Sequence, residues 1–262
     1  MKGESRLFWL FLLAVLALSG VSQLYEWEAP PPGTALAVDM GHLPMLALYS
    51  IRRMFAAYGL ALLFSIPYGY YAAVKPKLGK VLLPLLDVLQ SVPILGFFPA
   101  AIFAFIALSG GSRSGVEMAA VFLIFTSQAW NMAFGVYEAC TTLPQDLPEA
   151  LRSMGLDRSG AFRALYLPAM IPKLVYNSML SWAGGWYFLV ACEIIAVGSV
   201  RYDLPGLGSY LIRATEQGKM KECFAGLGLL ILIIVATDVL VWRPLAAWAA
   251  RFRYEMAASS IS

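Results

Sequence analysis

DLPEALRSMGLDRSGAFRALYLP, residues 146–168, is a polar and patterned stretch within an otherwise apolar chain. Asp146 stands three residues before Glu149, which is the pattern of a capping box at a helix start. Gly155 follows where a helix end favours a left-handed residue, and Asp157 can cap a second helix. The stretch therefore predicts two short helices between apolar segments.

The first of these helices carries an apolar stripe. Leu147, Leu151 and Met154 recur at i, i+4 and i+7, so they share one helix face. A helix of two turns is not stable alone in water, so the stripe needs a surface to lie on. Two surfaces remain open at this point: the protein's own helices, or a groove on a cytoplasmic partner.

Composition sets the class of protein. The 262 residues are 60% hydrophobic and 13% charged, with a mean hydropathy of +0.71, whereas a soluble domain is about 25% charged. The apolar blocks reach the roughly 20 residues that span a bilayer as helix. We therefore expect an all-α, polytopic membrane protein with about six transmembrane helices. The expected spans are 7–24, 51–74, 81–108, 116–138, 168–198 and 223–242.

The chain is expected to divide into two parts. Residues 1–44 are expected to form an N-terminal transmembrane helix and an external linker, and 45–262 a core of five transmembrane helices. Residues 1–23, with a basic start and an apolar stretch of about 12 residues, also fit a signal peptide, whose cleavage would leave the other five spans unchanged. Pro93 and Pro99 predict a bend in the third span.

Loop charges predict the orientation. With the N-terminus inside, most of the 19 basic residues fall in cytoplasmic loops, which places both termini and residues 146–168 in the cytoplasm. The same bias explains the net charge of +3 without nucleic acid as a partner. Arg52 and Arg53 are expected to snorkel from the start of the second span, or to attract anions at its outer mouth.

The sequence offers no catalytic site. His42 is the single histidine, and the three cysteines form no CxxC pair, so neither a histidine-ligated zinc site nor a Ser-His-Asp triad is predicted. The phosphate-binding pattern G-x-x-x-x-G-K-[ST] is also absent. We therefore expect no catalytic residue, cofactor or metal in this chain.

Within 146–168, residues at fixed spacing carry a further pattern: Glu149, Ala150, Leu151, then Gly155 after three residues, Leu165 after nine more, and Leu167 and Pro168. This resembles the EAA loop of permease subunits of binding-protein-dependent ABC importers. The family pattern has Ala and Ile where this chain has Leu151 and Leu165, and both departures are apolar. Segments 50–73, 84–106 and 181–211 resemble the nitrate/sulfonate/taurine-type branch of that family.

The resemblance implies a division of labour. Two permease subunits, expected to be a homodimer, would form the pathway in the cytoplasmic (inner) membrane. A cytoplasmic ATPase dimer would supply ATP and Mg²⁺ chemistry, and an extracytoplasmic binding protein would deliver a small anion such as nitrate, bicarbonate or an organic sulfonate. The implied ATPase-coupling loop comprises Glu149, Ala150, Leu151, Met154, Gly155, Leu167 and Pro168.

Glu193 is the one carboxylate expected inside a span, where ionisable groups face a cavity or a partner. With Asn177 and Ser181 it is a candidate for the pathway or the subunit interface, an interhelical contact being favoured over solute binding. Asp87 and Glu117, near span starts, are expected to be interfacial. The alternative function is a secondary transporter that uses Glu193 for proton coupling, although the internal repeats common in such proteins are not visible.

Overall fold

The computed structural model describes residues 38–110, 113–144, 146–197 and 200–252. The N-terminal half comprises η1 (Met40–His42), α2 (Leu43–Val74), α3 (Pro76–Ser91), α4 (Ile94–Leu108) and α5 (Arg113–Thr141). The C-terminal half comprises α6 (Asp146–Ser153), α7 (Arg158–Ala161), η2 (Phe162–Tyr166), α8 (Leu167–Glu193), β1 (Ile194–Val197), β2 (Val200–Asp203), α9 (Leu207–Glu216), α10 (Met220–Thr237), η3 (Asp238–Trp242), α11 (Arg243–Ala249) and η4 (Ala250–Phe252). The expected first span, 7–24, lies outside the described residues, as does most of the segment 1–44.

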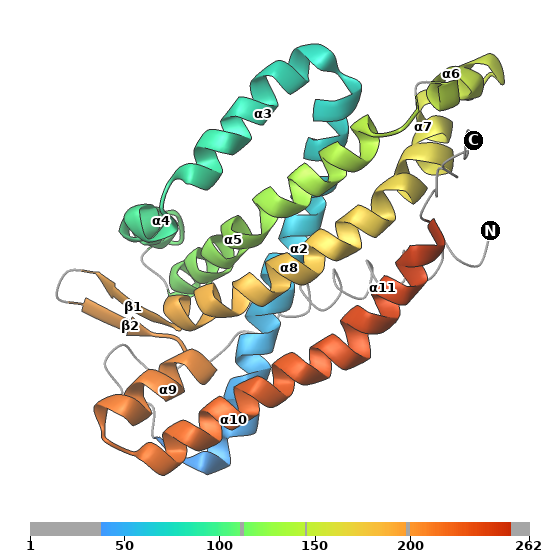
Figure 1. Cartoon of the computed structure of the whole chain (residues 1–262). Coiled ribbons are helices and arrows are strands. Elements are labelled where there is room, and N and C mark those ends of the chain that lie inside the picture. The colour runs from blue at the N-terminus through green and yellow to red at the C-terminus, as the bar shows by residue number, and fades with distance from the viewer. Residues whose placement is uncertain (1–37, 111–112, 145, 198–199, 253–262) are drawn as a thin grey trace.

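Helices α2, α5 and α8 pack together as the centre of the molecule (Figure 1). Polar side chains join them inside the apolar packing: the Ser65 hydroxyl of α2 donates to the Ala129 carbonyl of α5 at 2.8 Å. Hydrogen bonds of this kind satisfy polar groups that would otherwise be buried without partners. The expected helical membrane fold is confirmed.

Three described helical segments are long and apolar enough to cross a membrane: Met40–Val74, Ser114–Thr141 and Met220–Phe252. Pro76–Ser91 and Gly96–Leu108 meet at 102° and make a fourth if they are one broken span. Helix α8 is not among them; its sequence includes Lys173, Asn177 and Ser178. The count of about six spans therefore stays a prediction.

Several boundaries differ from the expected spans. Helix α2 begins at Leu43 rather than 51, with a proline in its first turn, so the division between 44 and 45 falls inside it. The sixth helical segment starts at Met220 and continues through η3 and α11 to Ala249. The bend predicted in the third span is confirmed at Pro93, because Val92 before it is extended and ends α3. Pro99 lies inside α4 without ending it.

The fifth span ends earlier than expected. Helix α8 stops at Glu193, not at 198, and the chain continues into an antiparallel hairpin in which Ile194 pairs with Asp203 and Val197 with Val200. Isoleucine and valine favour strands, so the apolar run does not continue as helix. The hairpin turns the chain back, and the Leu204 amide donates to the Glu193 carbonyl at 2.9 Å.

Candidate functional site

A buried group of charges lies where α2, α5 and α8 meet the segment before α9. The Arg53 side chain is only 2% exposed. Its Nε and Nη2 donate to the two carboxylate oxygens of Glu117, each at 2.7 Å. Its Nη1 donates to Glu193 Oε1 and to the Pro205 carbonyl, both at 2.8 Å. We call Ser50, Arg53, Glu117 and Glu193 the ion cluster.

Glu193 is the last residue of α8 and is fully buried. Its Oε1 accepts from the Ser50 hydroxyl at 2.6 Å, in addition to Arg53, and its Oε2 accepts from the Gly208 amide at 2.6 Å. The Leu207 amide donates to Ser50 Oγ at 2.9 Å. The carboxylate and the hydroxyl thus satisfy the first amides of α9, where the helix dipole also favours negative charge.

Two glycines allow the chain to lie this close to the carboxylate. A Cβ on Gly206 would overlap the Glu193 carboxylate group. A Cβ on Gly208 would lie 2.7 Å from the Val190 Cα and 2.9 Å from Glu193 Oε2. The Gly206-Leu207-Gly208 sequence is therefore required by close approach of the backbone to the ion cluster.

The ion cluster places one guanidinium between two carboxylates. Burying charges costs several kcal/mol per ion, which hydrogen bonds and opposite charges offset only when each group has partners. Arg53 has three such partners, and Glu193 has three donors. The cluster thus joins α2, α5, α8 and the start of α9 in one arrangement, and loss of one member removes a partner from each group that it contacts.

The ion cluster corrects two expectations. Arg53 does not snorkel: its head group is buried against Glu117 and Glu193. Glu117 is not simply interfacial, because it forms a bidentate pair with Arg53 and is 26% exposed. The sequence did contain a signal for the Arg53–Glu193 pair. A lone acid expected inside a span requires a hydrogen-bond donor from another span. Glu193 of α8 contacts Ser50 and Arg53 of α2, which is an interhelical contact of the kind favoured from the sequence.

Asn177 and Ser181 do not join the ion cluster. Asn131 Nδ2 of α5 donates to the Asn177 carbonyl and to Ser181 Oγ, both at 3.2 Å, and Ser181 Oγ donates to the Gln128 carbonyl at 3.1 Å. These bonds join α5 to α8. At 1.5 Å per residue, Asn177 and Glu193 lie about 24 Å apart along α8.

The residues after α5 form the two expected short helices, with Asp146 as the first residue of α6, so that its predicted capping box stays a prediction. Gly155 has φ +74°, and its amide donates to the Arg152 carbonyl at 3.0 Å while the Leu156 amide donates to the Leu151 carbonyl at 3.1 Å. These two bonds define a Schellman motif. Asp157 then caps α7, because its Oδ1 accepts from the Gly160 amide at 2.9 Å. That bond, with help from the Ser159 hydroxyl, lowers the pKa of Asp157 below its ordinary value.

The apolar stripe of α6 is not covered by the described part of this chain. No residue of α6 is buried, and Met154 is 73% exposed. Figure 1 shows α6 at the end of the molecule, beyond α7. Leu165 and Leu167, in the second half of the spaced pattern, are buried instead. The segment is therefore anchored to the bundle at its C-terminal end and projects at its N-terminal end.

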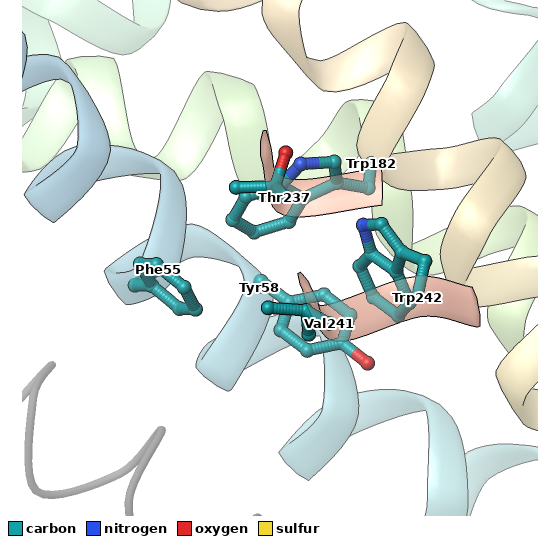
Figure 2. Close-up of a pocket in the computed structure, with 6 residues that line it drawn as sticks. All are labelled: Phe55, Tyr58, Trp182, Thr237, Val241 and Trp242. Carbon is teal, nitrogen blue, oxygen red and sulfur yellow. The ribbon is translucent and has the colours of Figure 1, made fainter. Parts of the chain in front are cut away.

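An aromatic cluster fills the space between α2, α8 and η3. The rings of Tyr58, Trp182 and Trp242 lie with every pair of centroids 5.7 Å apart, and Figure 2 shows them crowding a small cavity. The cavity is about 10 Å³, which is room for about one water molecule. It is a packing gap rather than a solute site.

Comparison with known families identifies the fold. The family described as "binding-protein-dependent transport system inner membrane component" matches residues 65–243. A solved structure, the inward-facing MetNI methionine ABC transporter, superposes with a TM-score of 0.66 over 80% of this chain and 99% of that chain, at 19% identity. At that identity the likeness concerns the fold alone.

Three curated relatives belong to named transport systems. The bicarbonate permease protein CmpB of Synechococcus elongatus is 24% identical over 78% of this chain and 66% of the relative. The nitrate import permease protein NrtB of Leptolyngbya laminosa is 25% identical over 66% and 57%. The taurine permease protein TauC of Escherichia coli is 25% identical over 70% and 62%. The chain spans about two thirds or less of the length of these relatives. It belongs to the family of inner-membrane components of binding-protein-dependent transport systems.

Proposed function

We propose that this membrane-embedded family member is the permease subunit of an ATP-driven importer, and that residues 146–168 couple it to a separate ATPase. The observation that carries the proposal is the stripe on α6: a capped helix with Met154 73% exposed and no buried residue. An apolar face on so short a helix needs a partner surface. Of the two surfaces open at the sequence level, a groove on a cytoplasmic ATPase is the one favoured.

The connectivity suggests how force would travel. Helix α7, which Asp157 caps at its start, contacts α6, and Leu165 and Leu167 anchor the following residues in the bundle. Helix α8 then runs 27 residues to Glu193, or about 40 Å at 1.5 Å per residue. A displacement of α6 would therefore move the start of the same helix whose end carries the ion cluster.

The proposed assembly contains a second permease copy, an ATPase dimer that holds ATP and Mg²⁺, and an extracytoplasmic binding protein. The proposed orientation keeps both termini and α6 in the cytoplasm. Arg53 and Arg213, which loop counting assigns to the outer side, form buried pairs with glutamates and with Asp203, respectively. Removing these internally paired arginines from the comparison strengthens the cytoplasmic excess of basic residues.

The proposed solute is a small anion. The named relatives belong to bicarbonate, nitrate and taurine systems, and each of these solutes carries an anionic oxygen group. A secondary transporter that uses Glu193 for proton coupling is less favoured. Glu193 already accepts hydrogen bonds from Ser50, Arg53 and Gly208, which leaves its carboxylate committed to the packing of α9.

The coupling proposal is tested on α6 itself. Met154→Asp places a charge in the stripe, and Glu149→Lys reverses a charge in the first turn; both should reduce co-purification of the ATPase and ATP-dependent uptake in proteoliposomes. Ser153→Asp is the matched control, because it adds the same charge one residue away, about 100° around the helix and outside the apolar stripe. Membrane insertion should be unchanged in all three.

Two results would contradict the proposal. If Met154→Asp and Glu149→Lys leave both ATPase co-purification and uptake unchanged, residues 146–168 are not the coupling loop. If the chain transports solute in proteoliposomes without any ATPase, it is not the subunit of an ATP-driven importer.

A further inference from the structure

A groove of about 470 Å³ opens between the C-terminal half of α2 and the start of α3. Its walls are apolar, formed by Leu63, Phe64 and Pro67 of α2 and by Leu78 and Leu82 of α3. It lies at the end of the bundle that carries α6 and α7 (Figure 1). The groove plays no part in the ion cluster or in the α6 stripe.

Contacts between α2 and α3 fix the relative position of the two walls of the groove. The Tyr68 hydroxyl donates to the Leu82 carbonyl at 2.7 Å, which joins one wall to the other. Near the turn, a Cβ on Gly79 would lie 2.5 Å from the Ala72 carbonyl oxygen, so the two helices approach closely there. The space between them is thus a built feature of the α2–α3 pair.

The mouth of the groove is cationic. Lys75 lines it, with its Nζ 4.9 Å from the centroid of the Tyr71 ring. Lys77 and Lys80 are exposed on the next turns. Within the described ranges, none of these three lysines forms an ion pair with a carboxylate. An apolar cleft therefore ends in positive charge that this part of the chain does not neutralise.

The surroundings of the groove are those of a lipid-facing surface. Helix α3 buries only Gly79 and Leu86 and exposes Val81, Leu85 and Val88. In a membrane protein such an apolar face meets acyl chains rather than water. A ligand that matches both the apolar walls and the lysine at the mouth would be amphipathic, with an anionic head group beside Lys75.

We propose that the groove binds one anionic phospholipid, with an acyl chain between α2 and α3 and the phosphate at Lys75. Basic residues beside a membrane span attract anionic head groups, each contributing about 1 kcal/mol. The proposed site does not depend on the proposed function. With α6 in the cytoplasm, as proposed above, the groove at the same end of the bundle would face the inner leaflet.

A lipid bound in the groove would also affect the packing of η2, the segment before α8. Tyr70, beside the groove residue Tyr71, packs its ring on Phe162 and Tyr166 of η2, with centroids 4.9 and 5.3 Å apart. A lipid that holds the end of α2 would therefore also stabilise the packing of η2. Bound anionic lipid should raise the melting temperature of the full chain.

The test compares two neighbouring lysines. Full-length protein in detergent is titrated with phosphatidylglycerol, and binding is measured by native mass spectrometry with thermal unfolding in parallel. Lys75→Gln should weaken binding about fivefold, which is the factor for one lost head-group contact, whereas Lys77→Gln should change it little. Leu78→Trp, which fills the groove without changing charge, should also reduce binding. Phosphatidylcholine with the same acyl chains and inorganic phosphate should each bind weakly and leave the melting temperature unchanged.

The following results would overturn the proposal. Equal losses in Lys75→Gln and Lys77→Gln would mean diffuse attraction to basic residues rather than a site. Equal stabilisation by phosphatidylcholine would mean that the net negative charge of the lipid is not needed. Equal stabilisation by inorganic phosphate would mean that the acyl chain is not needed. Undiminished lipid binding in Leu78→Trp would mean that the lipid binds outside this groove.

Discussion

The two polar regions at opposite ends of α8 follow different physical rules. At the Glu193 end, the charges are buried and each is satisfied by groups from other helices. At the other end, residues 146–161 satisfy their helix termini with their own side chains and backbone, and leave an apolar stripe exposed. The buried region is a tertiary construction, whereas the exposed region is a local one.

This difference predicts which property a substitution changes. Removing a charged member of the ion cluster leaves a buried charge without one of its opposite charges, so the folded state itself loses stability. Changing the α6 segment affects a small unit with few buried atoms, so the bundle should remain folded while coupling is lost. The predictions below test this separation, from the largest expected loss of stability to the smallest.

Arg53→Ala should have the largest effect. It leaves Glu193 fully buried without its cation, and breaking a buried pair in this way costs about 3–5 kcal/mol. Chemical or thermal unfolding of the purified protein measures the loss. Arg52→Ala is the matched control, since Arg52 lies next to it, is half-buried and stands near the Tyr49 ring. Similar losses in both variants would contradict a specific role for the cluster.

Gly208→Ala should cost less. Its new Cβ would lie 2.7 Å from the Val190 Cα and 2.9 Å from Glu193 Oε2, and overpacking of this kind costs about 1–3 kcal/mol. Gly228→Ala in α10, where nothing lies within 4 Å of the added Cβ, is the control and should be neutral or stabilising. A Gly208→Ala variant as stable as the control would show that the ion cluster tolerates displacement of α9.

Gly155→Ala should separate stability from coupling. The left-handed backbone at φ +74° costs a residue with a Cβ roughly 1–2 kcal/mol. Because α6 has no buried residue, we expect the bundle to unfold as in the wild type, while ATP-dependent uptake falls roughly 5- to 30-fold, the factor that such an energy represents. Gly218→Ala, at φ +67° between α9 and α10, is the control for backbone strain alone. Equal loss of uptake in both would remove the special role of 146–168.

Asp157→Ala should have the smallest effect on global unfolding and a local one on α7. Since the folded pKa of Asp157 is lowered, its contribution is fully present above the unfolded value of about 3.9 and is lost as the pH falls through the folded pKa. Amide hydrogen exchange at Gly160 should therefore be faster in the variant than in the wild type at neutral pH. The two proteins should converge at a pH below the folded pKa; a constant difference would contradict the cap as its source.

Much of the exposed segment could be predicted because its interactions are local. The capping role of Asp157 and the left-handed Gly155 depend on residues within five positions, so residue type and spacing were sufficient. The bend at Pro93 has the same local cause. The end of α8 at Glu193 was missed because an apolar run of this kind suits a helix or a strand, and pairing with residues 200–203 decides between them.

The sequence alone determined the membrane-helical class, the glycine end of α6, the Asp157 cap of α7, and the spaced pattern that led to the family. These depend on composition and on neighbours along the chain. The tertiary structure decided that Arg53 is buried rather than at the surface, because its partner Glu193 is 140 positions away. Tertiary structure also decided that α3 lies against α2 with a groove between them. Charge partners and grooves depend on which distant segments meet, and this is set only when the helices pack.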